Sequence, residues 1–353
     1  MTEFLWYIPN QTVAGHRGDD AGAGHNSLSA LTAQAEALEA HGWTGALIGT
    51  GWGRPDTFTV ATALAARTER FEPLIAIRPG YWQPAQFAAA AATLDHLSNG
   101  RVRINIVSGK DAFEQYGDAE GDQEARYGRT AEFMRLVRRL WTETEVTFAG
   151  AHYRVAGATV EPRIVPRPGR PHPPLYFGGA SAAAERVAAE LADVQLFWGE
   201  PRAALAARIA RLRALSAEVG RTLPPLEFGL RITTLVRATR AEAWADAEAK
   251  VARMAADAGA IWHDHRRAVA VGQQRLYDLQ AEGDVLDEAL YTAPGRFGGG
   301  GAATTWLVGS AEEVAEALRA YARLGISRFI LSDTPYLTEI RRQGDTLLPL
   351  LRG

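Results

Sequence analysis

Short apolar runs alternate with longer alanine-rich segments along almost the whole chain, and this alternation constrains the fold more than any other feature. The short runs are rich in β-branched and aromatic residues, which predicts strands, whereas the alanine-rich segments have helical spacing. The predicted strands are Phe4–Pro9, Gly45–Thr50, Pro73–Arg78, Val102–Ser108, Pro174–Phe177, Val194–Trp198, Leu226–Val236 and Phe329–Ser332. The predicted helices are Leu28–His41, Thr57–Arg67, Gln86–Leu97, Tyr127–Trp141, Ala182–Ala192, Ala203–Val219, Arg240–Ala256 and Leu337–Leu351. Eight strand–helix pairs in succession predict an α/β fold, the (β/α)8 TIM barrel.

Two segments interrupt the alternation. Val146–Val160 follows the fourth helix and has the pattern of a small hairpin insertion. Gly259–Thr305 lies between the seventh and eighth pairs, carries four consecutive glycines at 298–301, and is too long for an ordinary connection. We expect residues 1–353 to form a single domain, because such barrels run from about 200 to more than 400 residues, with 259–305 as a mobile active-site lid.

The composition is that of a globular chain. Apolar residues make up 47% and charged residues 22%, and the formal net charge is -3. The sequence has no apolar run of the roughly 20 residues that a membrane span needs, and it begins directly with a predicted strand, so we expect a cytoplasmic protein with no membrane partner. The absence of cysteine excludes disulfides, thiolate metal sites and thiol nucleophiles.

Charge and histidine patterns argue against two further classes of partner. Basic and acidic residues number 38 and 41, and the arginines are scattered rather than gathered in the basic stripe of a nucleic-acid binder. The only close histidines, His263 and His265, alternate in a polar stretch of the predicted lid, which is more typical of surface residues than of metal ligands. We therefore expect neither a nucleic-acid partner nor a metal.

The fifth predicted strand runs through Gly178, Gly179 and Ser181 directly into a helix. Two glycines let the backbone approach a ligand, and a helix N-terminus presents free N–H groups and the positive end of its dipole. This pattern favours a phosphate-binding turn. The alternative is a plain glycine turn in which Ser181 caps the helix.

Neither familiar nucleotide fingerprint is present. Gly49 and Gly51 follow a predicted strand as a dinucleotide loop would, but Arg54 stands where the third glycine of G-x-G-x-x-G is required. The glycines at 298–301 lead into alanine and threonine rather than the lysine of a phosphate loop. The sequence thus excludes both common motifs for nucleotides.

Aromatic and cationic residues follow several predicted strands, where the catalytic groups of barrels gather. Trp198 ends the sixth strand, and Arg231 lies in the alternating stretch Gly229–Leu235, where an inward arginine would be costly unless it met an anion. The alternative is an outward Arg231 paired with a helix carboxylate. The remaining members of this group are Trp6, Trp52, Trp82, Arg78 and Arg296.

Over nearly the whole chain the sequence resembles the bacterial luciferase-like flavin monooxygenases, and most closely the FMNH2-dependent alkanesulfonate monooxygenases. The matching motifs are Ala92–Arg101, Asn105–Gly109, Ala125–Tyr127 with Ala131–Phe133, Pro173–Gly179, Trp198–Pro201, Val271–Arg275 and Leu307–Gly309. The resemblance implies a TIM barrel that takes FMNH2 from an NAD(P)H:FMN reductase, reacts it with O2 and oxidises an organic substrate. It also implies a homodimer or homotetramer.

Residues can be carried over from this resemblance by position. The implied flavin and phosphate contacts are Asn105, Ser108, Tyr127, Gly178, Gly179 and Ser181. Trp198 and Arg231 match catalytic positions, and Arg296 is the nearest match to an arginine that binds the sulfonate from the mobile loop. The implied substrate-binding residues include positions at which this chain departs from the family pattern. They are Gln11, Trp52, Arg78, Thr233, Arg296 and Tyr336.

The departures concern three polar side chains. Gln11 and Thr233 stand where the sulfonate enzymes carry histidine, and Thr334 stands where they carry tyrosine, with Tyr336 close by. The leading hypothesis is a two-component monooxygenase that desulfonates an organosulfonate or similar anionic molecule, releasing sulfite and an aldehyde. Alternatives are a monooxygenase of the same family acting on a non-sulfonate polar metabolite, a flavin-binding protein without turnover, and a lyase-like or deazaflavin-dependent barrel.

Overall fold

The computed structural model describes residues 2–11, 24–109, 113–118, 122–167, 169–257, 271–297 and 304–352. The chain divides into two compact units. The first unit comprises Met1–Leu47, Leu196–Arg211 and Glu227–Gly353, and the second comprises Ile48–Gln195 and Leu212–Leu226.

Eight strands follow one another in a single sheet, and each is followed by helix, as the alternation predicts. The strands are β1 (Glu3–Ile8), β2 (Gly45–Ile48), β3 (Glu72–Ile77), β4 (Arg103–Ile106), β7 (Leu175–Gly178), β8 (Val194–Trp198), β9 (Glu227–Val236) and β13 (Ile326–Ser332). Among the described residues their order is β9-β13-β1-β2-β3-β4-β7-β8, and β8 pairs again with β9. The strand order returns to its start, which is the topology of the parallel TIM barrel, and the predicted fold class is confirmed.

In the second unit, β3, β4 and β7 pair in parallel and carry helices. These helices are α2 (Thr57–Ala65), α3 (Pro84–Leu97), α4 (Gln123–Thr142) and α5 (Ala182–Leu191), with the short helix η1 (Phe113–Tyr116) before α4. The strands are short and almost wholly buried, as parallel strands are when both faces are covered.

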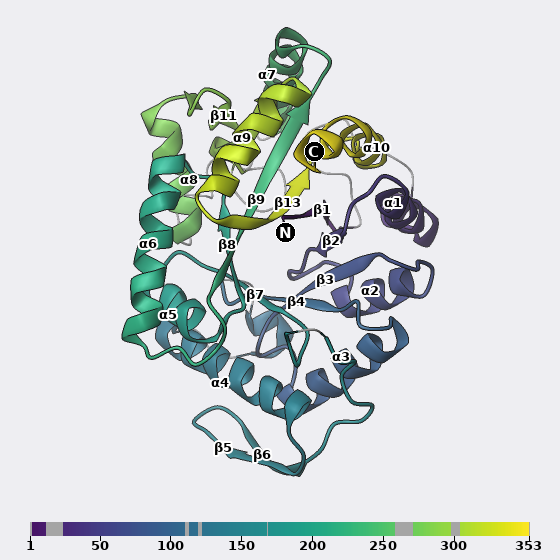
Figure 1. The fold of residues 1–353 in the computed structure, drawn as a ribbon, viewed down its shortest axis with the longest axis vertical. Coiled ribbons are helices and arrows are strands. Elements are labelled where there is room, and N and C mark those ends of the chain that lie inside the picture. Colours follow the sequence, from purple (N-terminus) through teal and green to yellow (C-terminus); the bar gives the residue numbers. More distant parts are fainter. Residues whose placement is uncertain are drawn as a thin grey trace. The chain divides into compact units, whose positions relative to one another are not determined.

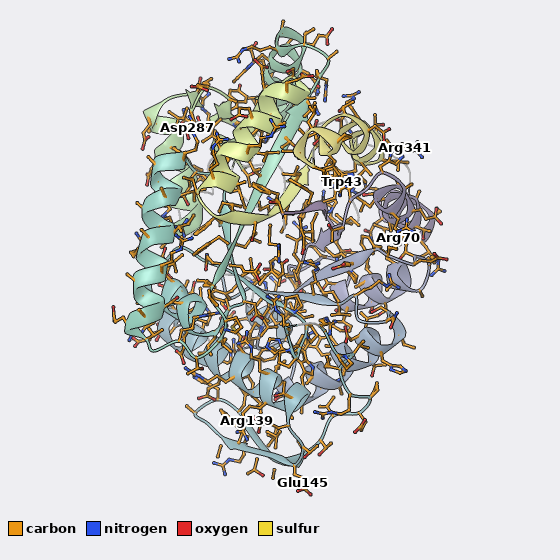
Figure 2. The ribbon with its side chains drawn as sticks, viewed as in Figure 1. Trp43, Arg70, Arg139, Glu145, Asp287 and Arg341 are labelled. Atoms are coloured by element: carbon orange, nitrogen blue, oxygen red, sulfur yellow. The ribbon has the colours of Figure 1, made fainter. Side chains whose placement is uncertain are left out.

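The predicted hairpin insertion is confirmed. Strands β5 (Val146–Ala149) and β6 (Arg154–Ala158) pair antiparallel next to α4 (Figure 1). The Glu132 carboxylate of α4 accepts hydrogen bonds from the backbone N–H groups of Ala151, His152 and Tyr153 at 2.8, 2.9 and 3.2 Å. Figure 2 shows Arg139 beside the hairpin, where its Nη1 donates to the Thr147 carbonyl at 3.3 Å. The insertion is therefore fixed to α4 by named polar contacts.

In the first unit, β13 pairs in parallel with both β1 and β9. The helices of this unit include α1 (Leu28–Ala40), α7 (Arg240–Asp257) and α10 (Tyr336–Thr346), and α6 (Arg202–Glu218) begins in it. Trp43, labelled in Figure 2, packs edge-on against Trp6 of β1 with 4.8 Å between ring centroids and donates to the Ile340 carbonyl of α10 at 3.0 Å. Trp6 therefore marks the face of β1 that is turned toward α10.

The segment predicted as a lid contains regular structure that the sequence analysis did not assign. Its described residues form α8 (Val271–Glu282), β10 (Val285–Leu286), β11 (Leu290–Tyr291) and the short helix η3 (Ala293–Phe297). Tyr291 and Ala293 are buried against Ala243, Ala247 and Met254 on α7. This part of the insertion therefore packs against α7 through apolar contacts. Its strands β10 and β11 also extend the sheet beside a further strand, β12 (Trp306–Gly309).

Residues 306–325 also differ from the sequence analysis, which assigned no element there. They form β12, parallel to β9, and α9 (Ala311–Arg323), which contacts both strands and lies beside β9 in Figure 1. Ser310 and Glu313 begin α9 with a reciprocal cap, in which each side chain accepts from the other residue's backbone N–H. The last predicted helix is in fact two, α10 and α11 (Leu348–Arg352), because α10 ends at Thr346.

Candidate active site

The predicted site residues fall in both units, and each group is described within its own unit. Those in the second unit are Trp52, Arg78, Asn105, Ser108, Tyr127, Gly178, Gly179 and Ser181. Those in the first unit are Gln11, Trp198, Arg231, Thr233, Arg296 and Tyr336.

The turn between β7 and α5 has the geometry that the sequence predicts. Gly178 ends β7, and Ser181 is the N-cap of α5, its Oγ accepting from the Ala184 N–H at 3.2 Å. A Cβ added at Gly179 would lie only 2.5 Å from the Cβ of Ala184, so glycine lets the strand end pack directly against the first turn of the helix. The turn thus combines a closely packed glycine with a capped helix N-terminus, and phosphate binding at this turn stays a prediction.

Gln195 supports this turn and was missed by the sequence analysis. Its Nε2, on the neighbouring strand β8, donates to the Gly179 carbonyl at 3.2 Å, and the side chain is fully buried. A buried glutamine in an otherwise apolar run, Val194–Trp198, is the signal that could have indicated this role. The hydrogen bond fixes the carbonyl of Gly179 and therefore the direction of the turn.

Asn105 and Ser108 lie at the carboxyl end of β4. Asn105 is only 7% exposed, and its Oδ1 is buried with no hydrogen-bond partner among the described residues. The Ser108 and Thr130 hydroxyl oxygens are 2.7 Å apart, and Thr130 donates its proton to the Arg126 carbonyl at 2.8 Å. Ser108 is therefore the donor to Thr130, so its own oxygen is left to accept a hydrogen bond.

Tyr127 contributes an aromatic wall on the same side of the unit. It lies in the first turns of α4, is buried, and packs edge-on against Phe177 of β7 with 6.5 Å between centroids. Phe177 directly precedes Gly178, so the tyrosine ring is adjacent to the strand that carries the glycine turn. The structure thus brings Tyr127 and the β7 turn together.

Trp52 and Arg78 lie after the ends of strands, where each contacts a residue of another loop. Trp52 is 46% exposed and packs edge-on against Tyr116 at 4.5 Å, and Tyr116 stacks on Tyr81 at 3.6 Å. Arg78 is buried, and its Nη1 donates to the Gly109 carbonyl at 2.7 Å, which fixes the backbone after β4. Neither tyrosine was predicted as a site residue, although each lies in the loop after a predicted strand, as Trp52 does.

Arg231 and Thr233 share one face of β9. Thr234, on the opposite face, donates to Gln343 of α10 at 2.6 Å, so the Arg231 face is turned away from that helix. The Arg231 guanidinium, in a side chain only 6% exposed, lies 4.1 Å from the centroid of the Tyr7 ring. Tyr7 follows Trp6, the residue turned toward α10, so Tyr7 also lies on the face away from the helix.

This geometry disfavours the alternative of an Arg231 that points outward to a helix carboxylate. The arginine is desolvated and rests on an aromatic face, which stabilises a cation by about 0.5–2 kcal/mol. On the same face the hydroxyl oxygens of Thr233 and Ser332 are 3.2 Å apart and both side chains are buried. The pair is neutral where the resemblance implies a histidine.

Trp198 ends β8 and faces the start of α8. A Cβ added at Gly272 would lie 3.5 Å from Cζ3 of the indole, so the first turn of α8 comes close to the ring. The two segments are also joined by charge, because the Glu200 carboxylate pairs with Arg208 and, at 3.5 Å, with Arg275 of α8. Glu200 was not predicted as a site residue, although it lies in one matching motif and Arg275 lies in another.

The other predicted residues of the first unit lie at its loops. Gln11 is half-buried, and Tyr336 is the first residue of α10, buried, with its ring 6.4 Å from that of His25. Arg296 of η3 forms an ion pair with Asp284. His263 and His265 lie outside the described residues, and within the described part no cluster of three or more potential ligands for a metal ion occurs.

None of the helices in the described ranges combines the length and the apolar character needed to cross a membrane.

The fold is shared with several solved structures. A riboflavin lyase (RcaE) has a TM-score of 0.82 at 20% identity, with 100% of this chain and 91% of that chain covered. A long-chain alkane monooxygenase (LadA) has a TM-score of 0.78 at 15% identity, with 99% and 91% covered. DmoA from Hyphomicrobium sulfonivorans has a TM-score of 0.78 at 19% identity, with 100% and 88% covered.

At these identities the likeness shows the fold alone. The sequence itself matches the family model of luciferase-like monooxygenases over residues 2–328. Because this match spans nearly all of its length, the chain belongs to the luciferase-like monooxygenase family.

Proposed function

We propose that the protein is a two-component FMNH2-dependent monooxygenase that uses O2 to desulfonate an organosulfonate or a similar anionic small molecule. The observation that carries this proposal is the buried guanidinium of Arg231 on the Tyr7 ring, on a strand face turned away from the helix layer. The planar fork of a guanidinium carries five N–H donors and suits a sulfonate, which presents several oxygens. The reaction converts the sulfonate, O2 and FMNH2 into an aldehyde, sulfite, FMN and water.

The residues of the second unit fit a flavin mononucleotide. Asn105 Oδ1 is a buried acceptor without a hydrogen-bond partner among the described residues, which suits an N–H donor of the flavin ring. Ser108 also retains acceptor capacity, because its proton goes to Thr130. The capped N-terminus of α5, approached closely at Gly179, would hold the phosphate, and Tyr127 would pack beside it.

Bound FMNH2 would supply the two electrons and the site of O2 activation. The work left to the chain is binding and the exclusion of water, because a wet site releases hydrogen peroxide instead of oxidised product. Arg231 would bind and orient the anionic group of the substrate. Trp198, with the first turn of α8 packed near its ring, would keep water from its side of the reacting groups.

A separate reductase is part of this proposal. The chain has no G-x-G-x-x-G fingerprint, since Arg54 replaces the third glycine, and so it lacks the usual motif for a nicotinamide dinucleotide. An NAD(P)H:FMN reductase would therefore supply the reduced flavin. Assembly as a homodimer or homotetramer and a cytoplasmic location also belong to the proposal, and light scattering of the purified protein tests the assembly.

The direct test of cofactor and substrate uses two steps. Anaerobic titration compares FMNH2 with a reduced deazaflavin, and the proposal predicts tighter binding of FMNH2, weakened in Gly179→Leu. The complex is then mixed with O2 and methanesulfonate, octanesulfonate or phenylmethanesulfonate, while sulfite and hydrogen peroxide are measured. Sulfite formation with at least one compound supports the proposal, whereas peroxide alone with every compound contradicts the sulfonate substrate.

A second candidate keeps the cofactor and changes the substrate. The buried hydroxyl pair of Thr233 and Ser332 is neutral, and it suits a polar but uncharged group. The shared fold with an alkane monooxygenase is consistent with a substrate that carries no anion. Under this candidate, oxygenation of a non-sulfonate polar compound should proceed in Arg231→Ala at close to the wild-type rate.

A further inference from the structure

Lys250 lies on the buried face of α7, where helical periodicity predicts an apolar side chain. On α7 the buried face is formed by Ala243, Ala247 and Met254, and Lys250 lies in register with them, only 1% exposed. It is the only lysine among the described residues, where the other basic side chains are arginine and histidine. A lysine buried to this extent requires acceptors for its ammonium group.

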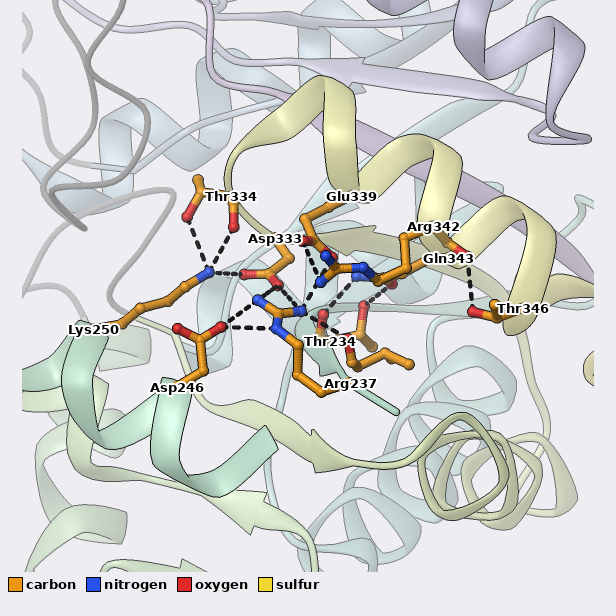
Figure 3. Close-up of polar contacts among 11 residues, drawn as sticks. Thr234, Arg237, Asp246, Lys250, Asp333, Thr334, Glu339, Arg342, Gln343 and Thr346 are labelled. Atoms are coloured by element: carbon orange, nitrogen blue, oxygen red, sulfur yellow. Dashed lines mark hydrogen bonds and ion pairs between the residues drawn. The ribbon is translucent and has the colours of Figure 1, made fainter. Parts of the chain in front are cut away.

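Three acceptors for this group come from the segment that follows β13. The Nζ of Lys250 donates to Asp333 Oδ1 at 2.9 Å, to the Thr334 carbonyl at 2.6 Å and to Thr334 Oγ1 at 3.4 Å (Figure 3). An ammonium group has three N–H donors, and three oxygens lie within reach. Lys250 therefore binds the side chains of Asp333 and Thr334 and the backbone carbonyl of Thr334. Thr334 lies two residues before Tyr336.

Arg237 completes the cluster from the end of β9. Its guanidinium pairs with Asp246 of α7, with Asp333 Oδ2 at 3.3 Å and with Glu339 of α10 at 3.2 Å (Figure 3). Asp333 thus lies between two cations from different elements, one from α7 and one from β9. The cluster ties the ends of β9 and β13 to α7 and α10.

Stability alone does not account for such a cluster. Replacing buried ion pairs by well-packed apolar groups is often neutral or stabilising, so their retention gives specificity of arrangement more readily than net stability. The arrangement fixed here is the loop at the carboxyl end of β13, the end where barrels place their functional side chains. The residue that this loop delivers into α10 is Tyr336.

We propose that Lys250 is a positioning residue, which fixes Asp333 and Thr334 so that Tyr336 is presented to the substrate in one orientation. The inference rests on the proposed function and on the substrate-binding role that the family resemblance implies for Tyr336. Lys250 itself touches no reacting atom in this account. Its effect on turnover passes through the tyrosine.

Kinetics of single and double variants test this dependence. Lys250→Met should lower kcat/KM for the best sulfonate by about tenfold or more, chiefly through KM, since misplacing a binding group by about 1 Å can cost up to a hundredfold. Tyr336→Phe should cause a similar loss, and the double variant should lose less than about twofold beyond Tyr336→Phe. Losses that multiply in the double variant would overturn the proposal.

Arg138→Met is the matched control for a buried ion pair. Arg138 pairs with Asp193 at 3.0 Å, and Asp193 accepts from the N–H of Leu175 at the amino-terminal end of β7, where barrel residues serve stability. The control should lower the Tm as Lys250→Met does but leave KM unchanged. If Lys250→Met fails to fold, Lys250→Gln keeps an amide donor at the position and takes its place in both experiments.

Hydrogen–deuterium exchange separates this inference from the proposed function. The backbone amides of residues 333–339 should exchange about tenfold faster in Lys250→Met than in wild type and at the wild-type rate in Arg138→Met. Wild-type protein that turns over no sulfonate contradicts the proposed function, while the exchange result still decides whether Lys250 holds the loop. Unchanged exchange in Lys250→Met would overturn the positioning role whatever the activity.

Discussion

Arg231 and Glu339 are two buried charged residues, and their surroundings lead to predictions about activity and about the pH dependence of stability. The Arg231 guanidinium lies 4.1 Å from the centroid of the Tyr7 ring, an arrangement that stabilises the cation. Glu339 lies in the cluster of Figure 3, where burial and the Asp333 carboxylate raise its pKa to about 7 against the pull of Arg237. Arg231 is proposed to bind an anionic substrate, and Glu339 holds its proton more tightly than an exposed glutamate does.

Arg231→Ala should lower kcat/KM for a sulfonate by about a hundredfold, because loss of one partner in a buried charged contact costs about 2–5 kcal/mol. Arg231→Lys should recover only part of this, since an ammonium cannot form the two parallel hydrogen bonds of a guanidinium. Arg139→Ala is the control, because Arg139 is a half-exposed member of a surface pair with Glu143. Steady-state sulfite release is the measurement, and wild-type kinetics in Arg231→Ala would contradict the assigned role.

Glu339 should make stability fall as the pH rises. Its pKa is raised from 4.5 to about 7 in the folded protein, so the folded state binds the proton more tightly than the unfolded state. This contribution is fully present below about pH 4.5 and is lost as the pH rises through about 7, by at most about 3 kcal/mol. In Glu339→Gln the free energy of unfolding, measured by urea titration at pH 5 and pH 8, should lose this component. An unchanged difference between the two pH values would refute the assignment.

At the level of single residues, sequence patterns predicted local geometry better than supporting contacts. The burial of Arg231 and the glycine turn before α5 could be predicted, because a charged residue in an alternating strand and a glycine pair before a helix are local signals. The roles of Gln195 and Lys250 could not, because their partners lie at Gly179 and at Asp333–Thr334, far along the chain for Lys250. Each nonetheless left a trace, a polar residue in an otherwise buried apolar pattern.

At the level of elements, the strand–helix alternation identified the barrel elements because burial on both faces gives parallel strands a continuous apolar pattern. It did not identify β10, β11 and β12, which are two to four residues long and follow or precede glycine-rich sequence. The helix α8 was missed because residues 259–305 were interpreted as one connection, and α9 was missed because no element was assigned to residues 306–325. The reciprocal cap of Ser310 and Glu313 was a usable signal for the start of α9.

Variants of Ser181 at the start of α5 distinguish a phosphate-binding turn from a turn in which Ser181 only caps the helix. Ser181→Ala should cost about 1 kcal/mol of stability through loss of the cap, whereas Ser181→Asp should keep the stability, because aspartate is also a good N-cap. If α5 binds the flavin phosphate, Ser181→Asp should weaken FMNH2 binding by about tenfold or more through charge repulsion. Ser310→Asp at the cap of α9 is the matched control and should leave flavin affinity unchanged. Equal affinity in Ser181→Asp and wild type would leave only the capping role.

At the level of the whole molecule, family membership and barrel topology limit the reaction class, while the substrate depends on a few side chains. The proposed flavin residues lie in the second unit and the proposed anion-binding arginine in the first. Variants in the two units should therefore separate, with Gly179→Leu lowering flavin affinity and Arg231→Ala lowering sulfonate turnover at saturating flavin.

The most direct test of the central claim follows both products of one reduced-flavin turnover. Purified protein is loaded anaerobically with FMNH2 and mixed with oxygenated buffer that contains octanesulfonate, and sulfite and hydrogen peroxide are quantified together. The account predicts that sulfite replaces peroxide as the sulfonate concentration rises, and that this replacement is lost in Arg231→Ala. Peroxide at the full stoichiometry of the flavin, unaffected by any sulfonate in the panel, would contradict it.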